Sequence, residues 1–367
     1  GCQTDGFITA RHICTEIIRI GEKMGLEKTI QKKRKIVYLE LLRIIACFCV
    51  IINHTNSGIF LSRTPDSKIW WVSLTYFFVS KTAVPIFLMI SGVLLLGHVD
   101  TYRKWSSRML HIFLDILIFS FFYYVWSMYT ADRSVNLIEY LKLIWQRNVT
   151  NAYWYLYLYL GILLMLPLFQ RLSVNMGKRE YELLILVCAV FMSTMPIVIH
   201  YMPGAAFSSY FCDPFFSEFV GIFFLGYYIH NYVPVKKEYA LAAVLVFGMD
   251  ILLQVLLTYR EYQVDPQQYL FFDERTFITV VTAAATPFYL GRCMEAVLTS
   301  EWFWKVVGFF GGCSFGIYLL SDFFLDSYYG IYGNLSERMN PMIAVFFYEC
   351  LIFLTGAAVT AVLKKIP

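Results

Sequence analysis

Long apolar runs constrain this chain more than any other feature of its sequence. Stretches of about 18 or more mostly apolar residues recur along its whole length. Inside a bilayer no water is available, so such stretches must satisfy their backbone hydrogen bonds internally as α-helices. Only 15% of the residues are charged, against about a quarter in a soluble domain, and 59% are hydrophobic. The sequence therefore predicts an all-α, polytopic transmembrane helical bundle.

We expect about ten spans, and the second is long enough to tilt or to bend at Pro85. Together they make residues 36–363 a single membrane domain, preceded by a cytoplasmic lead at residues 1–35. Met24 and the basic run after it are typical of an ordinary start, so residues 1–23 are interpreted as an over-extended start or an amphipathic lead. The expected spans are 36–54, 72–97, 108–128, 153–170, 181–199, 215–230, 239–258, 276–291, 303–324 and 341–363.

Basic residues predict how the bundle is oriented. With ten spans both termini lie on one side, and that side carries twenty Lys and Arg residues against eight in the opposite loops. Short loops rich in Lys and Arg stay in the cytoplasm. We therefore expect both termini to be cytoplasmic, in a multi-pass protein of the cell membrane (the inner or plasma membrane).

The first span contains the sequence RIIACFCVIINH, residues 43–54, which has an ionisable side chain at each end. Eleven residues separate Arg43 from His54, so both lie on one stripe of a helix, about 16 Å apart along its axis. Glu40 and Cys47 share this stripe. In one interpretation Arg43 pairs with Glu40 and His54 is merely interfacial; in the other, Arg43 binds an anion and His54 acts as a base in a polar channel.

This first span resembles the first helix of the membrane-bound acyltransferase family 3, which has an arginine, ten residues and a histidine. Further motifs of that family follow in order across residues 34 to 365. They are similar to PIFLMISGVLLL (85–96), RKWSSRMLHIF (103–113), AYWYLYLYLGILLMLPL (152–168), FVGIFFLGYYI (219–229) and CSFGIYLLSDFF (313–324).

The resemblance implies an enzyme that moves a small acyl group, usually acetyl, from cytoplasmic acyl-CoA to a hydroxyl of an extracytoplasmic glycan or another envelope molecule. Acyl-CoA is then a co-substrate, and no permanently bound cofactor is expected. Arg43 matches the family's motif arginine and His54 its essential histidine. The chain departs from the family where IYLLSD replaces a pattern that ends in histidine, so Ser321 and Asp322 leave the class of acceptor open.

Other candidate residues have two interpretations each. Arg108 either anchors a span or, with Arg43 and Glu40, forms the donor-binding end through bidentate contacts to phosphate. Ser91 either packs between helices or positions substrate. Trp154 and Tyr155 belong either to an aromatic belt or to a platform on which a sugar stacks, and Glu218 is a further acceptor contact.

Several classes of function receive no support from the sequence. The nine cysteines and six histidines show no metal-ligand spacing, and no nucleic-acid partner is expected. The expected partners are acyl-CoA, the hydroxyl acceptor and membrane lipids, with the oligomeric state open. The main rival is a polytopic transporter or flippase for an envelope precursor, which predicts internal repeats that we do not find.

Overall fold

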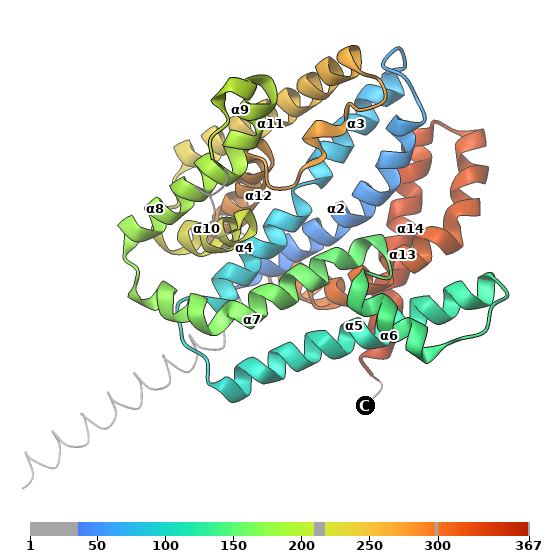
Figure 1. The fold of residues 1–367 in the computed structure, drawn as a ribbon, viewed down its shortest axis with the longest axis horizontal. Helices are drawn as coiled ribbons and strands as arrows, with labels where there is room; N and C mark the ends of the chain where they lie inside the picture. The colour runs from blue at the N-terminus through green and yellow to red at the C-terminus, as the bar shows by residue number, and fades with distance from the viewer. Residues whose placement is uncertain (1–35, 209–216, 298–299, 366–367) are drawn as a thin grey trace, which may run out of the picture. The chain divides into compact units, whose positions relative to one another are not determined.

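The computed structural model describes residues 36–208, 217–297 and 300–365, and the predicted lead at 1–35 lies outside these residues. The described part is helical and contains no strand (Figure 1). Its longer helices are α2 (Val37–Leu61), α3 (Lys68–Ser80), α4 (Ala83–Leu95), α5 (Tyr102–Thr130), α6 (Leu137–Gln146), α7 (Trp154–Asn175), α8 (Lys178–Val187), α10 (Glu218–Tyr232), α11 (Lys237–Val264), α12 (Ile278–Val297), α13 (Glu301–Arg338) and α14 (Pro341–Leu363). Shorter segments are η1 (Asn151–Tyr153), η2 (Cys188–Thr194), α9 (Met195–Tyr201), η3 (Pro203–Ala205) and η5 (Leu270–Asp273).

The prediction of an all-α polytopic bundle is confirmed. Within the described ranges, eight helical segments are long and apolar enough to cross a membrane. Two of the ten expected spans, 215–230 and 276–291, correspond to α10 and α12, which are not among these eight. Helix α10 has only 15 residues, fewer than a straight crossing needs. The cytoplasmic position of the termini remains a prediction.

The second expected span is interrupted at residues 81–82, between α3 and α4. The sequence predicted that this span either tilts or bends at Pro85, and the interruption lies shortly before that proline. The hydroxyls of Ser80 and Thr82 bond to the carbonyls of Phe77 (2.6 Å) and Val79 (2.7 Å), which also accept hydrogen bonds from the backbone N–H groups of Lys81 and Thr82. Pro85 lies in the first turn of α4, where a missing N–H costs nothing.

Close contact between α4 and α10 depends on two glycines. A Cβ atom on Gly92 would lie 1.8 Å from the Phe223 carbonyl oxygen, and one on Gly226 would lie 2.2 Å from the Met89 carbonyl oxygen. The two backbones therefore touch, as small residues allow in membrane bundles. This contact fixes α4, which carries one wall of the site described below.

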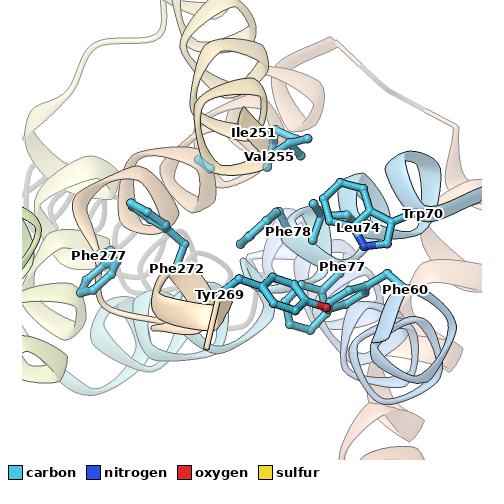
Figure 2. Close-up of a cluster of buried hydrophobic side chains, with 11 residues drawn as sticks. Phe60, Trp70, Leu74, Phe77, Phe78, Ile251, Val255, Tyr269, Phe272 and Phe277 are labelled. Atoms are coloured by element: carbon cyan, nitrogen blue, oxygen red, sulfur yellow. The ribbon is translucent and has the colours of Figure 1, made fainter. Parts of the chain in front are cut away.

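An apolar cluster holds the segment before α12 against α3 (Figure 2). It combines large rings of α2 and α3 with residues of α11 and of the turn around η5. Inside a bilayer, such side chains hold helices together through close van der Waals packing. The segment therefore has a fixed position, which matters because it carries Arg275. The cluster comprises Phe60, Trp70, Leu74, Phe77, Phe78, Ile251, Val255, Tyr269, Phe272, Phe277 and Ala283.

Candidate active site

The N-terminal end of α2 presents an arginine that already has a partner. A guanidinium nitrogen of Arg43 lies 2.7 Å from a carboxylate oxygen of Glu40, one turn earlier on the helix. The Arg43 side chain remains 30% exposed, whereas Glu40 packs against Gly311 of α13. The expected Arg43–Glu40 pair is therefore present, and Arg43 still offers donors to an outside group. Cys47, on the same stripe, is buried and donates to the Ser314 carbonyl.

A second arginine, Arg108 of α5, is held by an aspartate that the sequence reading overlooked. Asp100 pairs with Arg108 and with Lys104 (2.6 Å) and accepts a hydrogen bond from Gln170 (2.9 Å). Burial alone would raise the pKa of Asp100, but these donors and the charge of Arg108 hold it below its ordinary value. The carboxylate thus remains ionised and fixes the two cations at this end of the bundle.

Two stacked tyrosines of α7 connect these arginines to the centre of the bundle. Arg43 and Arg108 both act electrostatically on the hydroxyl of Tyr159. The Tyr159 ring stacks on Tyr155, with centroids 6.1 Å apart and planes inclined by 16°. The hydroxyl of Ser91 interacts with both tyrosine hydroxyls and donates to the Phe87 carbonyl.

Tyr155 leads to a small cavity of about 300 Å³ that His54 also lines. Its wall combines apolar side chains of α2 and α4 with polar residues, including Asn53, Lys81 and Arg275. The guanidinium of Arg275 lies 4.6 Å from the centre of the Trp154 ring, which is part of the same wall. Burial lowers the pKa of Arg275, and the neighbouring Glu274 opposes this shift. His54 thus meets two cations in a confined space.

His54 also lines a second, much larger cavity of about 1270 Å³. This cavity is bounded by the last turns of α2, the ends of α5 and α6, the segment before α7, and α13 and α14. Charged groups of both signs lie among tyrosines and hydroxyl groups in its wall. Those charged groups are Arg63, Arg133, Arg147, Glu139, Asp322 and Asp326. His54 therefore lies at the boundary between a small cavity and a large polar one.

Asp322 faces His54 from α13. It lines the large cavity, acts electrostatically on His54 and accepts a hydrogen bond from the Ala152 backbone N–H at 3.3 Å. Beside it, the Tyr123 hydroxyl accepts from the Phe323 N–H (2.9 Å) and donates to the Leu319 carbonyl (3.1 Å). In an uninterrupted α-helix, the Phe323 N–H would donate directly to the Leu319 carbonyl. A side chain inserted there opens a helix locally, and this opening lies next to Asp322.

Helix α14 fixes the turn of α2 that follows His54. A carboxylate oxygen of Glu349 accepts hydrogen bonds from Thr55 (2.5 Å) and Asn56 (2.9 Å). Asn56 in turn accepts, through its side-chain and backbone oxygens, from Ser73 of α3. Since Glu349 and Asn56 are fully buried, this network restricts rotation of α2 about its axis and so sets the direction of His54.

The structure brings three of the predicted site residues, His54, Trp154 and Tyr155, to the small cavity. Arg43 pairs with Glu40, whereas Arg108 pairs with Asp100. Glu218 lines neither cavity, and its described electrostatic contact is with Cys188. Among the described residues no cluster of side chains has the composition of a metal site.

Besides Asp100, sequence reasoning assigned no role in the site to three further residues, and one of them left a clear signal. Lys81 interrupts an otherwise apolar span, and an ionisable residue inside a span is a functional candidate by default. Arg275 lies in a loop without a motif, so nothing in its neighbourhood pointed to it. Asp322 was noticed only as a departure from the acyltransferase pattern.

The fold and the site define a polytopic helical membrane protein with a histidine between two cavities. A scan against protein families matches residues 36–362 to the acyltransferase domain Acyl_transf_3. The chain therefore belongs to this family of membrane acyltransferases, as the sequence motifs predicted. A search of curated proteins and a search of solved structures each find no match.

Proposed function

We propose that this membrane acyltransferase moves a small acyl group, in the first place acetyl, from acyl-CoA to a hydroxyl of an envelope glycan or similar acceptor. The observation that carries the proposal is the position of His54, which lines both the small and the large cavity. A base must lie within hydrogen-bond reach of the hydroxyl that it deprotonates. His54 meets this condition for an acceptor in the large cavity and a thioester in the small one.

Acyl-CoA enters, in this proposal, from the side of Arg43 and Arg108. The two guanidinium groups bind its phosphates through bidentate hydrogen bonds, and Glu40 and Asp100 hold them in place. The pantetheine arm then displaces the Tyr155 and Tyr159 side chains and reaches the small cavity. Along α2 the distance from Arg43 to His54 is about 16 Å by helical rise, comparable with an extended pantetheine arm.

The acceptor occupies the large cavity. Its volume of about 1270 Å³ exceeds what a small alcohol needs and suits a segment of a glycan. Its wall mixes charges of both signs with tyrosines, which supply hydrogen bonds to hydroxyl groups and flat faces for sugar rings. Asp322 orients the imidazole of His54 and stabilises the imidazolium that forms when the acceptor proton is taken.

Reconstituted vesicles that hold the protein in one orientation test this proposal. We expect label from acyl-labelled acetyl-CoA to reach an envelope glycan when the nucleotide is supplied on the Arg43 side and the glycan on the His54 side. The opposite arrangement should give no labelled glycan. A flippase, the alternative function, would instead move the glycan across the bilayer without adding an acyl group, and that result would overturn the proposal.

A further inference from the structure

Lys81 is a buried cation in the second span, and its position at the break between α3 and α4 calls for an explanation. Its side chain is only 2% exposed, and it lines the small cavity together with His54. Insertion of a lysine at the centre of a transmembrane helix costs at least about 2.5–3.5 kcal/mol. A residue with this cost needs either a structural or a chemical role.

A purely structural role explains little of what is observed. The ammonium of Lys81 pairs with Asp273 of η5 and lies 4.2 Å from the centre of the Phe77 ring. Yet the carbonyls before the break already accept hydrogen bonds from backbone N–H groups and from the hydroxyls of Ser80 and Thr82. The segment that carries Asp273 is held by the apolar cluster of Figure 2. Only the lysine of this pair is buried, since the Asp273 side chain is 39% exposed, and an ion pair with an exposed partner stabilises a fold little.

The ion pair does fix where the lysine lies, since Asp273 holds the Lys81 side chain at the wall of the small cavity. Arg275, two residues after Asp273, brings a second cation to the same wall. Both cations act electrostatically on His54. Next to His54, the side-chain oxygen of Asn53 is buried and has no hydrogen-bond partner within the described part of the chain, so it is available to a donor on a ligand.

We propose, on the basis of the function proposed above, that Lys81 binds the carbonyl oxygen of the acyl thioester, with Arg275 beside it, and stabilises the negative charge that develops there. The acceptor hydroxyl gives its proton to His54, and its oxygen bonds to the carbonyl carbon while the carbonyl π electrons move to oxygen. Lys81 and Arg275 then face this oxyanion. The C–S bond breaks as the carbonyl re-forms, and the CoA thiolate takes the proton from His54.

The same arrangement assigns a binding role to the rest of the small cavity. The unpaired side-chain oxygen of Asn53 would accept a hydrogen bond from an amide N–H of the pantetheine arm, close to the thioester. The cavity then holds the last part of the arm and the acyl group, with its two cations next to the reacting carbonyl. Removal of one preorganised donor at such a position typically lowers kcat about 10²–10³-fold.

Matched variants of the full-length protein separate this role from a structural one. Lys81→Gln removes the charge, Lys81→Arg keeps it, and Asp273→Asn removes the ion pair but leaves the lysine. We expect Lys81→Gln to lower kcat about 10²–10³-fold with the acyl-CoA dissociation constant changed less than about twofold. Lys81→Arg should recover part of the loss, and Asp273→Asn should retain at least about a tenth of the activity.

Other results would overturn the inference. Normal kcat in Lys81→Gln would exclude a role at the oxyanion, and so would equal losses of activity and thermal stability in Lys81→Gln and Asp273→Asn. Should Lys81→Gln fail to accumulate, Lys81→Arg replaces it, because a merely structural cation predicts full activity for that variant. Absence of acyl transfer by the unaltered protein would contradict both the proposed function and the role of Lys81. Normal transfer by Lys81→Gln, together with an inactive His54→Gln, would contradict only the role of Lys81.

Discussion

Replacement of Gly226 by alanine should separate α4 from α10 and destabilise the bundle. The new Cβ would lie 2.2 Å from the Met89 carbonyl oxygen and 2.4 Å from the Met89 Cα atom, both parts of the backbone. Ordinary contact begins at 3.4 Å, so the two helices must move apart by about 1.2 Å, which is 3.4 minus 2.2. Overpacking of this kind costs about 1–3 kcal/mol, and a clash with backbone belongs at the upper end.

Helix α4 also carries Phe87 of the small cavity, so the separation should lower acyl transfer together with stability. Reversible unfolding in mixed detergent micelles measures the free energy of unfolding. Gly248→Ala on α11 is the matched control, because a Cβ there meets nothing within 4 Å. In a helix that change stabilises by about 0.5–1 kcal/mol. Equal stability of the two variants would refute the argument.

Three further predictions concern the donor, the histidine and the topology. Arg43→Lys keeps the charge but loses the planar guanidinium, so KM for acyl-CoA should rise about tenfold while insertion into the membrane is unchanged. An unaltered KM in steady-state kinetics would remove Arg43 from the donor site. Asp322→Asn should lower kcat about 10²-fold, whereas Asp326→Asn in the same cavity should have little effect. Equal kcat values for these two variants would show that Asp322 does not orient His54. In a chain whose other cysteines are replaced, a membrane-impermeant thiol reagent added outside should label Leu335→Cys but not Lys35→Cys. Labelling of both would contradict the cytoplasmic position of the termini.

The fold was largely predictable because a bilayer leaves the chain few choices. An apolar run of sufficient length must become a helix, and the expected spans reappear as helices in the described residues. The interruption of the second span at residues 81–82 was not predicted, since the sequence indicated either a tilt or a bend at Pro85. Proline is a local signal, but it is tolerated in the first turn of a helix. The actual break depends on hydroxyls that bond to carbonyls one turn earlier.

The site was predictable only where its residues share one helix. Helical spacing placed Arg43 and His54 on a common stripe of α2, and the resemblance gave them roles. Lys81, Arg275 and Asp322 come from three separate segments that meet at His54 only in the folded bundle. Periodicity within one helix carries no information about such meetings. The aspartate that holds Arg108 was missed for a similar reason, since Asp100 lies in the short connection before α5.

Separate measurements of binding and transfer in His54→Gln test the central claim most directly. Glutamine keeps a polar side chain of similar reach but cannot accept and return a proton near neutral pH. We predict that this variant binds acyl-CoA with a dissociation constant within about twofold of the unaltered protein and transfers no acyl group to the glycan. Substantial acylation of the glycan by His54→Gln would contradict the account, because His54 would then position the acceptor without acting as its base.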